Sequence, residues 1–339
     1  MSDEKNVEQQ CADFREMFEA IRGEVARVIV GHEDIVDNVL ISLLCGGHVL
    51  LEGVPGLGKT LLVRTLGSAL SLEFRRIQFT PDLMPADIAG TNIVMEDATT
   101  GRREFQFQKG PIFGQIILAD EINRATPKTQ SAMLEAMQEH SVTSGGQVRR
   151  LQEPFMVLAT QNPIEQEGTY PLPEAQLDRF LFKLLVTYSN REQLKAVLDR
   201  TTTGQEPQAQ MVADAEKILW AQKLVRRVVV ADHVQDYAIR LVLATHPQGE
   251  FATAMVNQFV RFGSSPRGVQ ALVLGAKVRA MLNERYHVSF DDVARTVLPA
   301  LRHRVLLNFE GQAEGIQSDD ILSDVLKNTP RTLEQKLSA

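Results

Sequence analysis

The sequence is poor in residues that would support a covalently linked or metal-stabilised fold. It contains two cysteines, Cys11 and Cys45, without the spacing of a metal site or a disulfide framework. Its seven histidines are scattered, with neither a His-Glu-x-x-His motif nor a Cys/His cluster. A bound transition metal is therefore not expected, and the low cysteine content fits a reducing compartment such as the cytoplasm.

Long apolar runs and an excess of basic residues are also missing. No uninterrupted apolar stretch approaches the roughly 20 residues that a membrane-spanning helix needs. The opening segment, MSDEKNVEQQ, is polar and acidic, unlike a signal peptide. The formal net charge of −7 argues against DNA or an anionic membrane as the main partner. We expect a cytoplasmic protein with no integral membrane segment, for which nucleic acid is a disfavoured partner.

The composition that remains is that of a globular protein with about two domains. Apolar residues make up 44% and charged residues 23% of the 339 residues, enough to build a core without covalent links. Short apolar runs predict strands at 48–51, 74–79, 116–119, 155–159 and 180–186. Helical periodicity occurs in two stretches between about residues 15 and 45, and at 59–70 and 128–140. This alternation predicts a parallel α/β sheet with ligands at the carboxyl ends of its strands.

Helical periodicity dominates after about residue 188. Helices are predicted at 191–200, 213–229, 234–245, 267–283 and 290–304. Thr126 followed by Pro127 predicts the start of the helix at 128–140. Pro266, and Ser289 with Asp292, predict two helix starts in the second half. We therefore divide the chain into an α/β domain at 1–187 and a helical domain at 188–339.

A glycine-rich motif follows the first predicted strand. The segment GVPGLGKT matches G-x-x-x-x-G-K-[ST] in full. Its glycines let backbone N–H groups and a helix N-terminus face phosphates. Lys59 would contact the β- and γ-phosphates of ATP, and the Thr60 hydroxyl would ligate Mg²⁺. A chance glycine-rich turn is the alternative, but the strand before it and the helix after it favour a phosphate loop. The predicted nucleotide-binding residues here are Gly53, Val54, Pro55, Gly56, Leu57, Gly58, Lys59, Thr60 and Leu61.

Polar side chains follow the predicted strands at 116–119 and 155–159. Asp120 is expected to hold Mg²⁺ or its water, and Glu121 to polarise the attacking water. Alone, this pair would equally fit a solvated strand end, but beside a phosphate loop it predicts hydrolysis. Asn162 is expected to bond the γ-phosphate or orient the water, with a turn-capping role before Pro163 as the alternative.

The order and spacing of these motifs resemble those of the AAA+ ATPases, specifically the MoxR family. The segments that carry the resemblance are GVPGLGKT, IILADEINRA, LATQNP, EAQLDRF and SSPRG. It extends from about residue 15 to about residue 310. The resemblance implies a P-loop NTPase αβα sandwich with a parallel five-stranded sheet, a small all-α lid and a ring that is usually hexameric. The implied reaction converts ATP and water to ADP and phosphate.

The resemblance also assigns roles that spacing alone does not. Asn162 matches the first sensor, Arg179 the arginine finger that a neighbouring subunit inserts, and Arg267 the second sensor on the lid. Both arginines would neutralise charge on the γ-phosphate, with a surface salt bridge as the alternative for each. Gly31 and His32 resemble the family's adenine-contacting turn. ATP is expected between the two domains and at a subunit boundary, so that Arg267 would couple loss of the γ-phosphate to domain motion.

Two segments are predicted to project from the α/β domain as β-hairpins. They lie near 92–109 and 142–151 and resemble the helix-2 insert and the pre-sensor hairpin of this AAA+ clade. Contact with a substrate at the centre of a ring and a role as solvated turns are equally good interpretations. Separately, the Arg302-His303-Arg304 cluster at a predicted helix end is expected to offset the helix dipole.

The resemblance implies a chaperone-like ATPase that remodels or matures a client protein with a von Willebrand factor A domain partner. A nucleic-acid motor, a magnesium-chelatase-like motor subunit for metal insertion, and a regulatory module that binds ATP without turnover are the other functions considered. The acidic charge opposes the nucleic-acid motor. The intact acidic pair and Arg179 oppose the inactive module.

Overall fold

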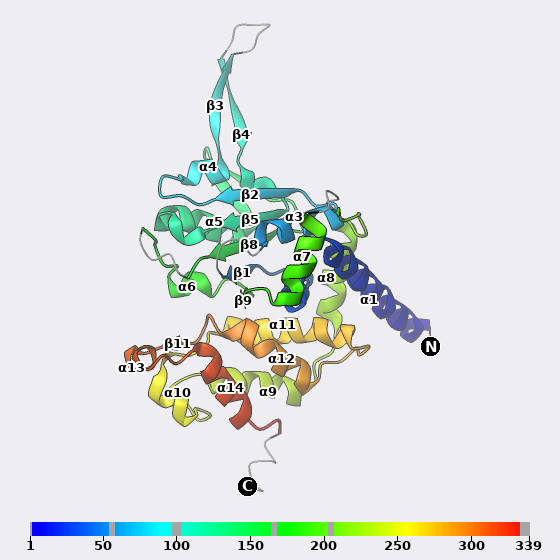
Figure 1. The fold of residues 1–339 in the computed structure, drawn as a ribbon, viewed down its shortest axis with the longest axis vertical. Helices are drawn as coiled ribbons and strands as arrows, with labels where there is room; N and C mark the ends of the chain where they lie inside the picture. Colours follow the sequence, from blue (N-terminus) through cyan, green and yellow to red (C-terminus); the bar gives the residue numbers. More distant parts are fainter. Residues whose placement is uncertain (1, 54–57, 97–102, 164–167, 203–206, 333–339) are drawn as a thin grey trace.

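A parallel sheet of five strands, in the order β2-β5-β8-β1-β9, forms the centre of the upper part of the molecule (Figure 1). The computed structural model describes residues 2–53, 58–96, 103–163, 168–202 and 207–332. The strands are β1 (Val49–Glu52), β2 (Phe74–Gln78), β5 (Ile116–Asp120), β8 (Met156–Gln161) and β9 (Phe182–Leu185). The strands predicted from the sequence and their parallel arrangement are confirmed.

Alternation of side chains along the interior strand β5 explains why its residues 116–119 are all apolar and buried. In β5, Ile116 and Leu118 belong to one buried cluster, whereas Ile117 and Ala119 belong to another. Successive side chains point to opposite faces of a sheet, so both faces are covered. The helices α1 (Ser2–Val28), α2 (Glu33–Cys45) and α3 (Lys59–Ala69) contribute to the first cluster, and α4 (Pro85–Ala89) and α5 (Pro127–Glu139) to the second.

Helix starts agree with the sequence in position and partly in chemistry. Ser289 caps its helix through its hydroxyl, with Asp292 completing a reciprocal capping box. Thr126 occupies the N-cap of α5, but its hydroxyl bonds the Thr129 hydroxyl (3.2 Å) and makes no capping bond to a backbone amide. The helix α1 begins at Ser2, whereas the sequence predicted a helix only from about residue 15. The first turns of α1 are polar and therefore show no apolar periodicity.

Most of the helical part lies below the sheet, but its first helix, at residues 191–201, lies beside the sheet (Figure 1). Its helices are α7 (Arg191–Thr201), α8 (Ala215–Arg227), α9 (Asp232–Leu243), α10 (Ala254–Phe259), α11 (Pro266–Leu282), α12 (Phe290–Leu301), α13 (Phe309–Ala313) and α14 (Ser318–Asn328), with a short ribbon of β10 (Val260–Phe262) and β11 (Leu306–Leu307). The five helices predicted here are confirmed, while α10, α13, α14 and the ribbon were not predicted. The helices α10 and α13 and the ribbon are too short to show a periodicity, and no helix was predicted after residue 304.

The two parts of the chain share buried contacts. One apolar cluster extends from α1 and α2 into α8 and α11, joining residues such as Val39, Leu224 and Ala276. The helix α7 lies beside α1, where Arg200 donates 2.9 Å hydrogen bonds to the carbonyls of Ala26 and Arg27. The domain boundary at residue 188 remains a prediction.

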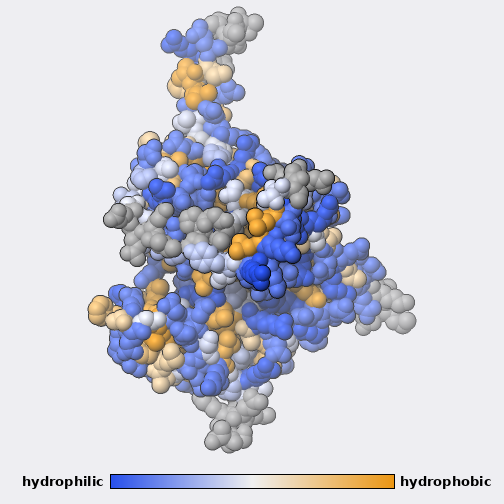
Figure 2. All heavy atoms as spheres, in the orientation of Figure 1, coloured by the Kyte–Doolittle hydropathy of each residue, from blue (hydrophilic) through white to orange (hydrophobic). Residues whose placement is uncertain are grey.

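Both predicted hairpins are present and antiparallel. The strands β3 (Gly90–Glu96) and β4 (Arg103–Lys109) form the longer one, which projects from the body, and β6 (Ser141–Ser144) and β7 (Gln147–Arg150) form the shorter (Figure 1). The turn of the longer hairpin lies outside the described residues. Apolar side chains are exposed on its arms, with Phe105 at 80% and Val94 at 57%, and they form the apolar patch on the projection in Figure 2. In the part of the chain that the structure describes, no helix is long and apolar enough to span a membrane.

Candidate active site

The phosphate-loop motif begins where β1 ends at the carboxyl edge of the sheet. Gly53 packs so closely that a Cβ there would lie 2.6 Å from the carbonyl oxygen of Val186, and Gly58 has a φ of 75° at the N-cap of α3. Both positions therefore need glycine. Lys59 is the first residue of α3, followed by Thr60 and Leu61 on its exposed first turn. The remaining predicted loop residues, Val54, Pro55, Gly56 and Leu57, lie outside the described residues.

Lys59 points back to the loop and lies near the acidic pair. Its Nζ donates a 2.6 Å hydrogen bond to the carbonyl of Gly53. Burial lowers the pKa of Lys59, while the negative charges of Asp120 and Glu121 act to raise it. The cation that would contact phosphates and the two carboxylates therefore face one another at the same edge of the sheet.

The hydroxyl of Thr160, at the end of β8, joins the two acidic residues. It donates to Oδ1 of Asp120 (2.7 Å) and accepts the backbone N–H of Glu121 (2.8 Å). The second carboxylate oxygen of Asp120 pairs with the Arg76 guanidinium of β2 at 2.7 Å. The position of Asp120 is thus fixed from both neighbouring strands, β2 and β8.

Glu121 adopts the left-handed backbone conformation, with φ 56° and ψ 49°. Such a conformation costs about 1–3 kcal/mol outside glycine and collects at functional sites. Its Oε2 accepts hydrogen bonds from Nε2 of Gln78 (2.8 Å) and from Nη1 of Arg124 (2.9 Å). The Glu121 carboxylate is therefore held between β2 and the short helical turn that follows β5.

The predicted adenine-contacting turn and the first sensor also lie at this edge. Asn162 is buried directly after β8. Gly31 and His32 both adopt positive φ, and burial lowers the pKa of His32. A cavity of about 470 Å³ lies against this turn. Its lining also includes Leu185, the last residue of β9, and Thr187, which follows β9. Val186 lies between Leu185 and Thr187 in the chain and packs closely against Gly53. This cavity is therefore next to the phosphate loop.

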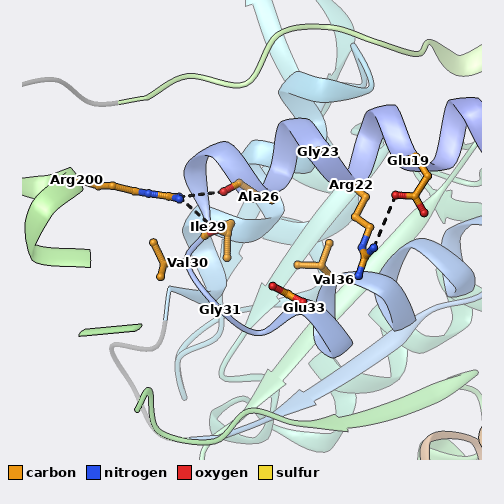
Figure 3. A pocket seen from close by; sticks show the side chains of 10 residues that line it. All are labelled: Glu19, Arg22, Gly23, Ala26, Ile29, Val30, Gly31, Glu33, Val36 and Arg200. Carbon is orange, nitrogen blue, oxygen red and sulfur yellow. Dashed lines mark hydrogen bonds and ion pairs between the residues drawn. The ribbon is translucent and has the colours of Figure 1, made fainter. Parts of the chain in front are cut away.

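A second cavity, of about 480 Å³, also has Gly31 in its lining (Figure 3). Its wall combines Arg22 and Glu19 of α1 with the apolar residues Ile29 and Val36, and Arg200 of α7 closes one end. Gly31 and Glu33 line both cavities. A side chain at Gly31 would meet Gln193, with a Cβ only 2.4 Å from that amide nitrogen.

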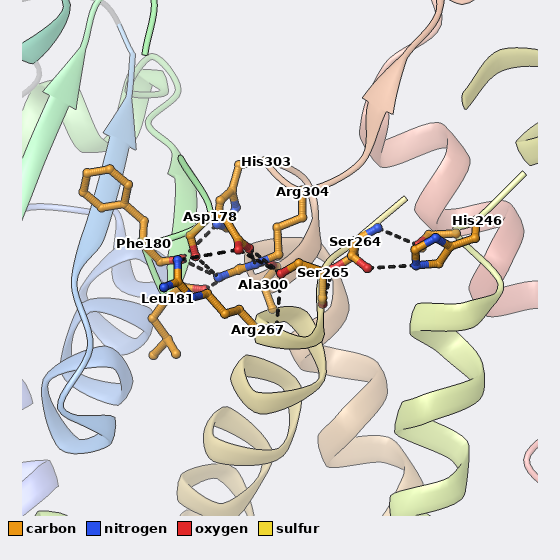
Figure 4. A network of polar contacts seen from close by, with 11 residues as sticks. Asp178, Phe180, Leu181, His246, Ser264, Ser265, Arg267, Ala300, His303 and Arg304 are labelled. Carbon is orange, nitrogen blue, oxygen red and sulfur yellow. Dashed lines mark hydrogen bonds and ion pairs between the residues drawn. The ribbon is translucent and has the colours of Figure 1, made fainter. Parts of the chain in front are cut away.

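The two predicted arginines lie together in a different place. Arg179 and Arg267 line a cavity of about 230 Å³ that also contains Arg226, Arg304 and one aspartate, Asp178. Nη1 of Arg267 lies 3.7 Å from Oδ2 of Asp178, within the polar network of Figure 4. Four arginines around one carboxylate give this cavity a strong positive charge, as a site for an anion requires.

This cavity lies at the amino edge of the sheet, opposite the phosphate loop. Its lining includes Gly46, Gly47 and His48, which precede β1, and Arg179 precedes β9, which runs parallel to β1. A strand of four residues separates the edges by about 13 Å. The structure therefore does not bring Arg267 to the phosphate loop of its own chain. The position of ATP between the two domains stays a prediction.

The interpretation of Arg302, His303 and Arg304 as residues that offset a helix dipole is wrong for most of the cluster. Arg302 forms an ion pair with Asp319 (2.8 Å), and His303 is buried against the carbonyl of Phe180. Arg304 is buried and pairs with Asp178 at 2.8 Å. These side chains join the helical part to the loop before β9, because the chain turns back toward the sheet where α12 ends.

Several residues of the site were not found from the sequence. Thr160 lay inside a recognised segment, and its place at the end of β8 was the available signal. Arg76, Gln78 and Arg124 contact the acidic pair, and Arg304 contacts Asp178. Nothing local distinguishes Arg76 and Arg304 from surface arginines, since their partners are set by the alignment of neighbouring strands and by packing. Arg124 lies three residues after Glu121 within a recognised segment, and this spacing was the available signal.

The parallel sheet, the phosphate loop and the helical lid together define a P-loop ATPase of the AAA+ class. A family model described as "ATPase family associated with various cellular activities (AAA)" matches residues 48–182, and one described as "AAA lid domain" matches residues 252–325. The crystal structure of a candidate ATPase from Cytophaga hutchinsonii has a TM-score of 0.90 to this chain at 40% identity, covering 97% of this chain and 99% of that one.

Relatives in other bacteria give the family. Chaperone MoxR1 of Mycobacterium tuberculosis is 42% identical over 90% of this chain and 79% of that protein. Protein YeaC of Bacillus subtilis, which is uncharacterized, is 45% identical over 89% of this chain and 91% of that protein. Protein MoxR of Paracoccus denitrificans is 30% identical over 90% of this chain and 92% of that protein. The chain belongs to the MoxR family of AAA+ ATPases.

Proposed function

We propose that this protein hydrolyses ATP at the boundaries between subunits of a ring, with six subunits as the expected number. The observation that carries the proposal is the separation of two incomplete half-sites on opposite edges of one sheet. Lys59 and the acidic pair lie at the carboxyl edge, whereas Arg179 and Arg267 lie at the amino edge. Only a second copy of the chain can bring the arginines to the phosphates.

The carboxyl edge supplies the groups that bind and activate. Lys59 neutralises the β- and γ-phosphates, and the cavity beside Gly31 and His32 accepts the adenine. Glu121 polarises the attacking water, and Asn162 orients it or bonds the γ-phosphate. The arginines of the neighbour then stabilise the charge that develops during transfer.

Thr60 and Asp120 fit Mg²⁺, which prefers oxygen ligands and binds through one or two carboxylates together with substrate phosphates. Within the described residues, no group of three or more His, Cys, Asp and Glu could hold a metal ion without a nucleotide. The expected dependence is therefore on MgATP as a unit. The ion would neutralise phosphate charge between Thr60 and Asp120.

A mixing experiment tests the proposed boundary site. Arg179→Ala chains keep a phosphate loop but lack the finger, and Lys59→Ala chains keep the finger but lack the loop cation. Each variant alone is expected to be nearly inactive, and a mixture that co-assembles is expected to recover phosphate release. No recovery in a co-assembled mixture would contradict action across the boundary.

The work that hydrolysis drives is proposed to be chaperone-like remodelling or maturation of a client protein, together with a von Willebrand factor A domain partner. The name of the relative MoxR1, a chaperone, supports this. Because Glu121→Gln should bind ATP without hydrolysing it, assemblies of this variant should retain partners. Affinity capture with Glu121→Gln, compared with Lys59→Ala as the control, would identify them by mass spectrometry.

A further inference from the structure

Arg304 is a buried arginine of the lid that holds the loop beside the finger. Its Nε donates to Oδ1 of Asp178 (2.8 Å), and its Nη2 donates to the carbonyls of Asp178 (2.9 Å) and Phe180 (2.7 Å). Its Nη1 donates to the carbonyls of Leu181 (3.1 Å) and Ala300. The Arg304 guanidinium therefore bonds the residues on both sides of Arg179 and also the last turn of α12, the helix that precedes Arg304.

Asp178 is bonded by a second element of the lid. The hydroxyl of Ser265 lies 2.8 Å from both oxygens of the Asp178 carboxylate, to which it donates. The same hydroxyl accepts the backbone N–H of Arg267 (3.1 Å) as the cap of α11. Asp178, the residue directly before Arg179, is thus bonded to the start of α11, which carries Arg267 (Figure 4).

We infer that Arg304 and Asp178 are positioning residues that fix Arg179 and Arg267 as a single unit, which one subunit presents to the phosphates of its neighbour. The inference rests on the proposed function. It assigns the coupling of the lid to the finger loop to a buried ion pair, neither member of which contacts the phosphates itself.

Energetics favour a geometric role for this pair over a stabilising one. A buried ion pair loses so much hydration that it adds little net stability compared with apolar residues of similar size. The guanidinium of Arg304 is planar and bonds several acceptors in fixed directions, which the ammonium group of a lysine does not reproduce. Burial lowers the pKa of Arg304 to about 10, so the side chain stays charged at neutral pH.

The test uses Arg304→Lys in the full chain, which keeps the positive charge and loses the fork of hydrogen bonds. We expect kcat for ATP to fall about 10- to 100-fold, the usual cost of misplacing catalytic groups by about 1 Å. We expect KM for ATP to change less than about twofold, because the phosphate loop of the variant is intact. Asp178→Asn should give the same pattern.

A mixture distinguishes positioning from stabilisation. Arg304→Lys chains mixed with excess Lys59→Ala chains receive intact arginines from their neighbours, so their turnover should return to that of wild-type chains in the same mixture. A defect in the fold of the variant itself would persist. Arg285→Lys is the matched control, because Arg285 forms a bidentate ion pair with Asp292 entirely within the lid (2.7 and 2.8 Å). It should lower the melting temperature without lowering kcat.

The outcomes separate the two proposals. If Arg179→Ala is rescued in the mixture but Arg304→Lys is not, the positioning role is overturned and the boundary site stands. If Arg179→Ala is not rescued either, the boundary site itself fails. If Arg304→Lys and Asp178→Asn fail to fold while Arg285→Lys folds, the pair is a stability element and the inference is overturned.

Discussion

At the scale of single residues, a threonine hydroxyl organises the two acidic residues of the candidate site. Thr160 both donates to Asp120 and accepts from the amide of Glu121, so it holds Glu121 in a conformation that a non-glycine residue rarely adopts. The conformational cost is met by this contact and by the bonds from Gln78 and Arg124 to the Glu121 carboxylate. The acids are therefore prearranged before any nucleotide arrives.

The first residue-scale prediction separates binding from turnover. Lys59→Ala removes the cation that faces the phosphates, so its affinity for a fluorescent ATP analogue should fall steeply. Glu121→Gln keeps that cation and should bind the analogue normally, while phosphate release falls about 10²- to 10⁴-fold, the usual contribution of a general base. Equal binding by both variants would contradict the assignment of Lys59.

The second prediction concerns Thr160→Val, which preserves the shape of the side chain and removes its hydroxyl. The Glu121 amide then loses its partner, and we expect a loss of about 1–3 kcal/mol in the free energy of unfolding. We also expect a fall in kcat larger than that of Thr143→Val, a matched exposed threonine on β6. Chemical denaturation and phosphate release measure the two effects, and an unchanged kcat would show that the hydroxyl does not position the acids.

At the scale of elements, a buried histidine joins α5 to two strands at the amino edge of the sheet. His48, just before β1, accepts the N–H of Val157 at Nδ1 (3.0 Å) and contacts the carbonyl of Met137 through Nε2 (2.9 Å). These partners require a neutral ring with its hydrogen on Nε2. Burial lowers the pKa of His48 to about 4, helped by His140 and opposed by the bond to Met137.

This depressed pKa predicts a pH-dependent stability. Below the ordinary histidine pKa of about 6.5, His48 binds a proton in the unfolded chain but stays neutral in the folded chain. The free energy of unfolding therefore falls from about pH 6.5 toward pH 4. The free energy of unfolding of the wild type should therefore decline more steeply than that of His48→Gln, by up to about 1.4 kcal/mol per pH unit. Urea titrations at several pH values measure both slopes, and identical slopes would mean that His48 titrates normally.

At the scale of the whole molecule, the sheet separates the two sets of charged groups that catalysis would need. The arginine-rich cavity at the amino edge contains one aspartate, while the carboxyl edge carries Asp120 and Glu121. A neighbour's nucleotide would place its phosphates opposite these arginines. Bound ATP should therefore act as a link between subunits.

The corresponding prediction is that ATP promotes assembly in the absence of hydrolysis. Glu121→Gln with MgATP should elute as a larger particle in size-exclusion chromatography with light scattering than the same protein without nucleotide. Adding Arg179→Ala to the Glu121→Gln chain should reduce that assembly, and high salt should weaken it because charges form the contact. An ATP-independent size would contradict a nucleotide link.

The strands, most of the helices and the phosphate-loop motif can be predicted from the sequence alone. Each of these is encoded locally: apolar runs in which neighbouring residues face opposite sides of the sheet, caps such as Ser289, and the glycine at position 58, where α3 begins. The acidic pair was also predictable because it directly follows β5.

Which of these groups meet depends on how separate elements pack in the folded chain. Arg304 reaches a loop 126 positions earlier in the chain, and the register of neighbouring strands brings Thr160 and Arg76 to Asp120. Local periodicity and spacing carry no information about contacts that form when separate elements pack. For that reason Arg179 and Arg267 were recognised individually, whereas their common place at the edge opposite the phosphate loop followed from the docking of the lid.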